Sequence, residues 1–146
     1  MKYIAYGSNM STGQMAYRCP DAKLIGTGRL LGAQLEFFLH ATVERSQIKN
    51  ASVPVAVWEI SRQDERFLDR YEGFPSYYIK DEWLVHMDDG TQIKGMIYLM
   101  NQKRDCPPTT VYYNGIRDAY IELGLCSQIK RVLRPALSRS IRHTRR

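Results

Sequence analysis

The 146-residue sequence contains few of the residues that build metal sites or disulfide scaffolds. Its three cysteines, Cys19, Cys106 and Cys126, are an odd number, lie far apart and include no C-x-x-C pair, so they do not form a disulfide framework. The three histidines show neither H-x-x-x-H nor H-x-H spacing and do not cluster with the cysteines. We therefore expect no metal site and no small secreted domain held by disulfides.

Long apolar runs and nucleotide or nucleophile signatures are also missing. No apolar segment approaches the ~18 residues that a membrane span needs, and residues 1–6 lack the apolar region and cleavage site of a signal peptide. Neither the P-loop pattern G-x-x-x-x-G-K nor the nucleophile elbow G-x-S-x-G occurs. These absences predict a single soluble, cytoplasmic domain that uses no cofactor.

The formal net charge of +6 is distributed unevenly along the chain. Residues 128–146 contain seven basic residues and no acid, which leaves 14 basic against 15 acidic residues in the remainder. A nearly neutral body argues against a surface that tracks nucleic-acid phosphates, and favours a small-molecule site. We therefore divide the chain into a domain over residues 1–127 and a basic amphipathic C-terminal helix and tail over residues 128–146.

The coarse pattern of apolar residues predicts mixed secondary structure. Alternating apolar and polar residues are typical of half-buried strands, and Asp89-Gly90 between two such runs indicates a hairpin. The predicted strands cover residues 2–6, 28–39, 53–60, 77–87 and 91–100. Together with the helices below, they predict an α+β fold with a strongly bent sheet or a small barrel.

Four helices are expected from capping residues and helical spacing. Ser11 caps a short helix that ends at Cys19, and S-x-x-D at Ser61 starts a second helix that ends at Gly73. A third helix runs from Thr110 to Gly124. The last is expected to begin at Ser127 and to kink at Pro135. Its apolar side is expected to pack on the body or on a second subunit up to about Ile141, with residues 143–146 disordered.

The segment Tyr6-Gly7-Ser8-Asn9 is a turn between a predicted strand and a predicted helix start. A turn of small residues can direct several backbone N–H groups to one point, and a helix N-terminus adds partial positive charge. Such a turn is suited to a carboxylate. An ordinary capped turn would contain the same residues, so this segment alone does not identify a site.

Glu72 occupies an unusual place at the end of the predicted helix 61–73. There it faces the negative end of the helix dipole, which should raise the pKa of its carboxyl group, and aromatic residues surround it in sequence. A carboxyl group with a raised pKa can shuttle a proton. The alternative is an exposed acid paired with Arg70 or Lys80. The other acids of this helix, Asp64, Glu65 and Asp69, are expected on a solvated face with neighbouring arginines.

Taken together, several motifs resemble the γ-glutamylcyclotransferase-like (AIG2-like) family. They are Tyr6-Gly7-Ser8-Asn9, Arg18-Cys19-Pro20, residues 68–75 (LDRYEGFP) with Tyr78, and Pro108-Thr109 followed by Tyr112. The resemblance runs from residue 3 to about residue 125. It implies a small mixed β-barrel with flanking helices, Glu72 as the catalytic acid/base, and a γ-glutamyl pocket. The residues implied to bind the substrate are Tyr6, Gly7, Ser8, Asn9, Tyr78 and Tyr112.

The sequence departs from the family pattern at two places. Ala56 lies in a strand where family members often have glycine, and Ala119 replaces a common glycine late in a helix. Both are expected to narrow or reshape the pocket.

The resemblance implies an enzyme that cyclises a γ-glutamyl amine or peptide to 5-oxoproline. Two other classes stay open: a non-catalytic small-molecule binding protein on the same fold, and a protein that binds a polyanion or nucleic acid through its basic tail. The sequence leaves the amine on the far side of the amide bond and the oligomeric state undetermined.

Overall fold

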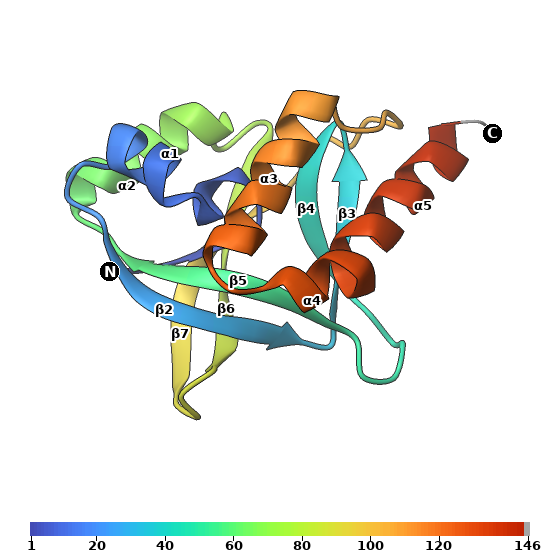
Figure 1. Ribbon diagram of the computed structural model, residues 1–146. Coiled ribbons are helices and arrows are strands. Elements are labelled where there is room, and N and C mark those ends of the chain that lie inside the picture. The colour runs from blue at the N-terminus through green and yellow to red at the C-terminus, as the bar shows by residue number, and fades with distance from the viewer. Residues whose placement is uncertain (145–146) are drawn as a thin grey trace.

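The computed structural model describes residues 1–144 and contains a closed five-stranded barrel with helices around it (Figure 1). The order around the barrel is β1-β5-β2-β6-β7. It closes where β1 pairs in parallel with β7 at Tyr3 and Met96, whereas the other barrel pairs are antiparallel. The predicted α+β fold with a small mixed barrel is thereby confirmed. The barrel strands are β1 (Lys2–Ala5), β2 (Lys23–Leu31), β5 (Ser52–Glu59), β6 (Tyr78–Met87) and β7 (Gln92–Met100).

A separate two-stranded sheet consists of β3 (Ala33–Phe38) and β4 (His40–Arg45). The prediction of one strand over residues 28–39 is therefore wrong. The chain turns at Gly32, which has a φ of 67°, and enters a different sheet. The alternating pattern continues through this turn and conceals it, because β3 places its own apolar residues inward after β2 has ended.

Helices α1 (Thr12–Arg18), α2 (Arg62–Glu72) and α3 (Thr110–Glu122) follow the predicted signals. Ser11 caps α1 by accepting a hydrogen bond from the Gln14 N–H. Ser61 and Asp64 form a complete capping box on α2. Gly73 ends α2 in the left-handed conformation, with a φ of 65°, which glycine adopts without steric penalty.

The C-terminal segment is less regular than its pattern predicts. It consists of α4 (Cys126–Gln128), a π-helical turn η2 (Ile129–Leu133) and α5 (Arg134–Thr144). The expected Ser127 cap is wrong, because α4 begins after Leu125 without a side-chain cap. Expected disorder from residue 143 is also wrong for His143 and Thr144, which are helical; residues 145–146 lie outside the described part of the chain.

Helix α5 lies against the β3–β4 sheet (Figure 1). Leu133 and Ala136 are fully buried, and Arg139 bonds both the Glu36 carboxylate and the Leu35 carbonyl of β3. Of the two predicted surfaces, the structure shows the body, which buries Leu133 and Ala136, whereas Leu137 and Ile141 are only half-buried. The π-helical turn lies just before Pro135, whose ring conflicts with the carbonyl four residues earlier.

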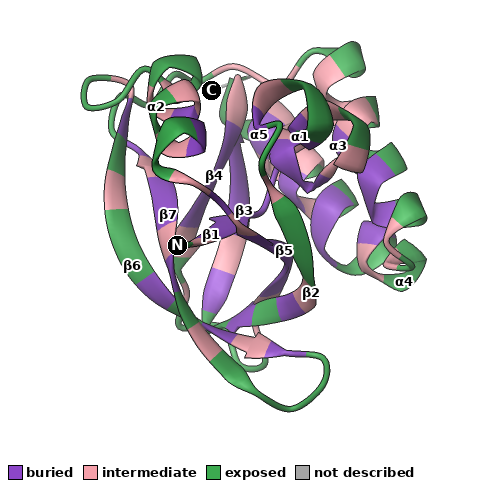
Figure 2. Cartoon of the chain, turned by 90° about the vertical axis from the view of Figure 1, so that its left-hand side faces the viewer, coloured by how far each residue is buried: buried purple, intermediate pink, exposed green. Residues whose placement is uncertain are grey.

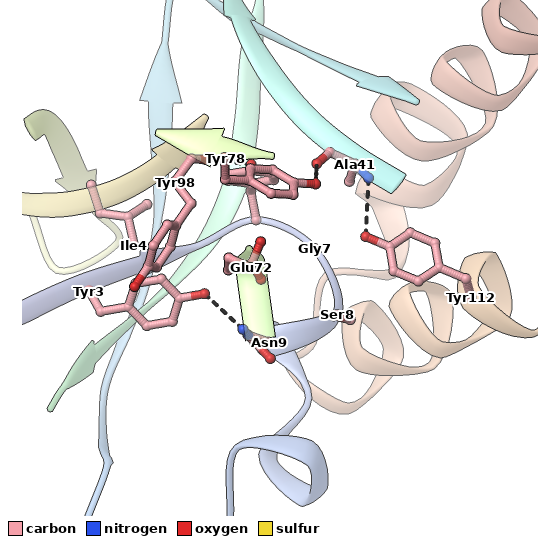
Figure 3. A pocket seen from close by; sticks show the side chains of 11 residues that line it. Tyr3, Ile4, Gly7, Ser8, Asn9, Ala41, Glu72, Tyr78, Tyr98 and Tyr112 are labelled. Carbon is pink, nitrogen blue, oxygen red and sulfur yellow. Dashed lines mark hydrogen bonds between the residues drawn. The ribbon is translucent and has the colours of Figure 1, made fainter. Parts of the chain in front are cut away.

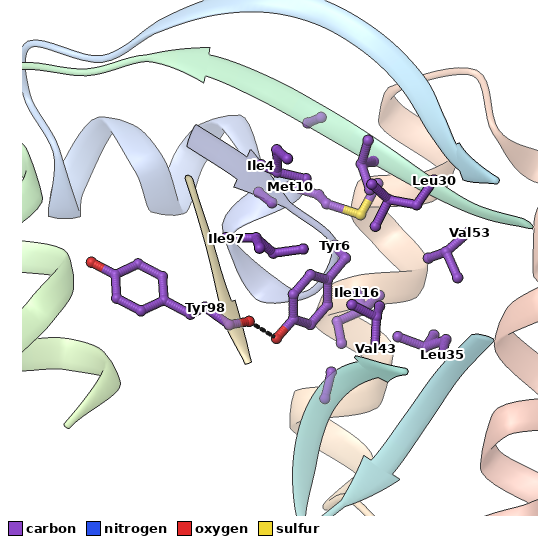
Figure 4. Close-up of a cluster of buried hydrophobic side chains, with 14 of the residues drawn as sticks. Ile4, Tyr6, Met10, Leu30, Leu35, Val43, Val53, Ile97, Tyr98 and Ile116 are labelled. Atoms are coloured by element: carbon purple, nitrogen blue, oxygen red, sulfur yellow. Dashed lines mark hydrogen bonds between the residues drawn. The ribbon is translucent and has the colours of Figure 1, made fainter. Parts of the chain in front are cut away.

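The core fills the barrel and continues beneath α3 and the β3–β4 sheet. Figure 2 shows that β1 and β5 are mostly buried, while β6 and β2 alternate with exposed positions. In Figure 4 the Tyr6 side chain lies among core residues and donates a hydrogen bond to the Tyr98 carbonyl, at 2.6 Å. Among residues 1–144 no helix combines the length and apolar character that crossing a membrane requires.

Candidate active site

A pocket of about 310 Å³ opens where several elements meet at one end of the barrel. Figure 3 shows the Glu72 side chain at its centre, between the Gly7–Asn9 loop and the rings of Tyr98 and Tyr78. All seven residues that the sequence placed in the site line this pocket: Tyr6, Gly7, Ser8, Asn9, Glu72, Tyr78 and Tyr112. They come from segments up to about a hundred positions apart. The fold therefore brings together in one pocket residues that lie far apart in the sequence.

Glu72 is the last residue of α2, and Gly73 turns the chain away immediately after it. Its carboxylate borders the pocket, and none of the described residues donates a hydrogen bond to it. The alternative pairing with Lys80 is not formed, because Lys80 binds Glu65 and Asp69 instead. Among the described residues Glu72 thus has no hydrogen-bond partner, and its side chain is half-buried in the pocket.

Burial raises the pKa of Glu72 to about 7, and the nearby Arg18 charge opposes this rise. The direction agrees with the sequence prediction, but its main physical cause is desolvation of the carboxylate rather than the helix dipole alone. A carboxyl group with a pKa near neutrality can accept and return a proton at ordinary pH.

The Gly7–Asn9 loop crosses the pocket as the start of a 3₁₀ turn, η1 (Ser8–Met10). Its hydrogen bonds run from the Met10 N–H to the Gly7 carbonyl and from the Ser11 N–H to the Ser8 carbonyl. The N–H groups of Ser8 and Asn9 lie at the open end of the turn, where no carbonyl of the turn can accept them. They are candidate donors to a bound carboxylate or oxyanion.

Arg18, at the end of α1, holds this loop in place. Its guanidinium donates hydrogen bonds to Ser8 Oγ and Asn9 Oδ1, and stacks 3.6 Å from the Tyr71 ring centroid. The buried Asn9 amide also donates to the Tyr3 hydroxyl, at 2.9 Å. The side chains of Ser8 and Asn9 are therefore engaged in fixing the loop. Arg18 belongs to one of the sequence motifs, but the motif alone does not indicate this role.

Two tyrosines from opposite sides of the pocket bind the same residue of β4. Tyr78 donates to the Ala41 carbonyl at 2.6 Å, and the Ala41 N–H donates to the Tyr112 hydroxyl at 3.1 Å (Figure 3). Burial raises the pKa of both hydroxyls well above the ordinary tyrosine value. Both therefore stay neutral and support a rigid wall around Glu72.

Tyr98 and Asp69 are site elements that the sequence did not indicate. Tyr98 lines the pocket and donates to Asp69 Oδ1 at 2.6 Å, while Lys80 bonds the same carboxylate and Glu65. The prediction that Asp64, Glu65 and Asp69 lie on a solvated face is wrong. Asp64 is fully buried in the capping box, and Glu65 and Asp69 are bonded to Lys80. The period of a single helix could not show that β6 and β7 pack against this face.

The two departures from the family pattern lie away from the pocket. Ala56 and Ala119 are buried in the core, and neither lines the space around Glu72. The expectation that they narrow the pocket is not supported by this geometry. Within residues 1–144 no group of three or more His, Cys, Asp or Glu side chains is arranged to hold a metal ion.

Comparisons with known proteins agree with the fold and the pocket. The sequence matches the family "Gamma-glutamyl cyclotransferase, AIG2-like" over residues 3–115. It is 28% identical over 122 residues to human gamma-glutamylcyclotransferase, covering 75% of this chain and 64% of the human protein. The mouse gamma-glutamylcyclotransferase is 29% identical over 143 residues, with 90% of this chain and 76% of the mouse protein covered.

A solved structure of a gamma-glutamyl cyclotransferase has the same architecture. It superposes with a TM-score of 0.81 at 28% identity, covering 91% of this chain and 85% of the other. The barrel, the helix that ends at Glu72 and the loop at residues 7–9 all lie within the matched residues 3–115. This chain therefore belongs to the γ-glutamyl cyclotransferase, AIG2-like family.

Proposed function

We propose that this protein is a γ-glutamylcyclotransferase that converts a γ-glutamyl amine or peptide into 5-oxoproline and the free amine. The observation that carries the proposal is the Glu72 carboxylate, which lies in the pocket, accepts no hydrogen bond from residues 1–144 and has a pKa raised to about 7. Membership of the family and the names of the human and mouse relatives support it.

The substrate carries its own nucleophile, so the enzyme mainly has to position it. The α-amine attacks the γ-carbonyl carbon, a five-membered ring forms, and the bond from that carbon to the leaving nitrogen breaks. Holding the reacting atoms in this folded arrangement supplies a large part of the rate enhancement. The reaction as written requires no cofactor.

Glu72 acts as the general acid and base in this proposal. Its carboxylate accepts a proton from the substrate α-ammonium, which frees the amine for attack. The same proton then passes to the leaving nitrogen as the amide bond breaks, so the carboxylate is regenerated. The ring nitrogen loses a second proton, which the released amine carries away as its ammonium form. A group with a pKa of about 7 is suited to both transfers.

The loop and the tyrosine wall fix the substrate around Glu72. The N–H groups of Ser8 and Asn9 are proposed to bind the α-carboxylate or the developing oxyanion. Tyr6, Gly7, Tyr78 and Tyr112 shape the pocket and exclude water from it. A buried, rigid site strengthens these electrostatic interactions relative to bulk water.

The test is release of 5-oxoproline from a panel of γ-glutamyl compounds. Glu72→Gln retains shape and hydrogen-bonding atoms but cannot carry the proton, so kcat should fall by roughly 10² to 10⁴ while product binding survives. Glu82→Gln, the same substitution at an exposed position of β6, is the matched control and should turn over normally. If the wild type binds 5-oxoproline but releases none from any compound, it is a non-catalytic binding protein instead.

A further inference from the structure

A second hollow adjoins the pocket on the outer side of Glu72. It measures about 430 Å³ and shares Ser8, Glu72, Tyr78 and Tyr112 with the inner pocket. Its additional walls are His40, Tyr71 and Tyr77. Because Glu72 borders both spaces, a substrate whose γ-glutamyl part fills the inner pocket would extend its other part into this hollow.

A third hollow, of about 710 Å³ and partly open to solvent, lies next to the second. The two share His40 and Tyr77, and the outer one is completed by Leu39 and by residues of the loop that follows β7: Gln102, Lys103 and Arg104. The three neighbouring spaces follow one another from Glu72 to the loop at residues 102–104, and a ligand path through them would run past His40 and Tyr77.

Apart from Glu72, the middle hollow of this path is lined by uncharged and mostly aromatic side chains. His40 Nδ1 lies 2.9 Å from the Tyr77 hydroxyl, and the His40 ring packs edge-on with Tyr112 and Tyr77, with centroids 5.1 and 5.8 Å apart. Burial lowers the pKa of His40, so its ring is neutral near pH 7. Such walls favour an apolar ligand segment.

The outer end of the path is positively charged. Lys103 forms an ion pair with Glu44 and lies over the Phe38 ring, so its charge is already compensated. Arg104 is exposed, and within the part of the chain that the structure describes it forms no ion pair. Burial raises the pKa of Tyr77, and the Arg104 charge partly opposes that rise, which places this charge close to the path. The neighbouring Asp105 does not line the hollow.

We infer that the two outer hollows form the leaving-group subsite, and that Arg104 selects γ-glutamyl peptides with an apolar segment followed by a free carboxylate. This inference rests on the proposed function. The guanidinium group matches a carboxylate with two parallel hydrogen bonds, which an amide or an alkyl end cannot accept in the same way. Because Arg104 is exposed, the preference should be moderate and should weaken with salt.

The test compares γ-glutamyl-phenylalanyl-glycine with its C-terminal amide. For the wild type we expect kcat/KM to be about 3- to 10-fold higher for the free acid at low salt, mostly through KM. Arg104→Gln should bring this acid-to-amide ratio close to one. Arg62→Gln, at the far end of α2 and outside all three hollows, is the matched control and should retain the wild-type ratio.

The outcomes separate this inference from the proposed function. A wild-type ratio of one, or a ratio that survives Arg104→Gln, would overturn the role of Arg104 while 5-oxoproline release still supports the cyclotransferase. Equal loss of the ratio in Arg62→Gln would show a general charge effect and would also overturn it. Absence of 5-oxoproline from both peptides and from simpler γ-glutamyl compounds would remove the proposed function, and the subsite with it.

Discussion

The acidic residues at the two ends of α2, Asp64 and Glu72, have opposite environments. At the N-terminal end, Asp64 is buried but bonds the Ser61 N–H, in keeping with the usual preference for acids near a helix start. At the C-terminal end, Glu72 is half-buried, accepts no hydrogen bond from the described residues and faces the negative end of the helix dipole. The first arrangement stabilises the fold, whereas the second provides the proton carrier of the proposed reaction. An acid placed against the local preference of a helix is therefore a better candidate for a functional role than an acid that obeys it.

The largest expected effect is a pH dependence of activity that comes from Glu72 at the C-terminal end of α2. Glu72 must be ionised to accept the ammonium proton, so kcat/KM should rise with pH through its pKa of about 7. Between pH 8 and pH 5 we expect a loss of roughly 100-fold, measured as a pH profile of 5-oxoproline release. A profile that is flat over this range would exclude Glu72 as the base.

Ligand binding by the loop at residues 7–9 should depend more on the absence of a side chain at Gly7 than on the hydroxyl group of Ser8. A Cβ at Gly7 would lie 3.4 Å from the Ala41 Cβ and 3.5 Å from the Tyr112 hydroxyl, so the branches of valine would crowd both. We expect Gly7→Val to weaken 5-oxoproline binding by about 30-fold or more, corresponding to ~2 kcal/mol. Ser8→Ala should weaken it much less, because the proposed donors are backbone groups.

Calorimetric titration of 5-oxoproline measures both effects. Gly13→Val in α1 is the matched control, since a Cβ there meets no atom closer than 3.9 Å. Equal affinity in Gly7→Val and Ser8→Ala would remove the loop from the site.

The raised pKa of Glu72 should also change how the free energy of unfolding depends on pH. Its folded-state pKa lies above the unfolded value, so the folded state is undisturbed below about pH 4.5 and is destabilised as pH rises through about 7. Glu72→Gln removes this penalty. The free energy of unfolding of the variant, relative to wild type, should increase by about 3 kcal/mol between pH 4.5 and pH 7.5.

Urea denaturation at several pH values measures this difference. Glu82→Gln should show little change relative to wild type over the same interval, because that side chain is exposed. A constant difference between Glu72→Gln and wild type at all pH values would contradict a raised pKa.

The N-terminal end of α2 should affect stability alone. Ser61→Ala removes the bond from the Asp64 N–H to the Ser61 hydroxyl, at 3.0 Å, and should lower the free energy of unfolding by about 1 kcal/mol. Turnover should be unchanged, because this end lies about 15 Å along the helix from Glu72. Thermal melting and kinetics together check this; reduced turnover at an unchanged melting temperature would show that the two ends are coupled.

The smallest effect is expected at the C-terminal end of α5. Deleting residues 142–146 removes Arg142, which is exposed and does not line the pocket, together with the residues after it, so turnover should stay within about twofold. Removal of everything after Ser127 should instead destabilise the protein, because Leu133 and Ala136 leave the core. A large drop in turnover for the short deletion, with an unchanged melting temperature, would place the tail in substrate capture.

Capping residues and turn residues in the sequence correctly predicted where several helices begin or end and where one hairpin turns. The caps at Ser11 and Ser61, the end of α2 at Gly73 and the hairpin around Gly90 all form as expected. The failures have a common cause. Gly32 is a turn hidden inside a continuous alternating pattern, and the polar face of α2 contacts Lys80 of β6 and Tyr98 of β7, which lie outside the helix. Neither feature is encoded within a window of a few residues.

The sequence by itself determined the helix that ends at Glu72, the small-residue loop at residues 7–9 and the family resemblance, because caps, turns and motifs are short-range properties. Only the tertiary structure decided that Arg18 clamps the loop, that Tyr98 binds Asp69 and that Lys80 is drawn away from Glu72. These contacts depend on barrel closure, which brings β1, β6, β7 and α2 to one pocket. Desolvation in that enclosed space, a property of the assembled fold, raises the Glu72 pKa toward neutrality.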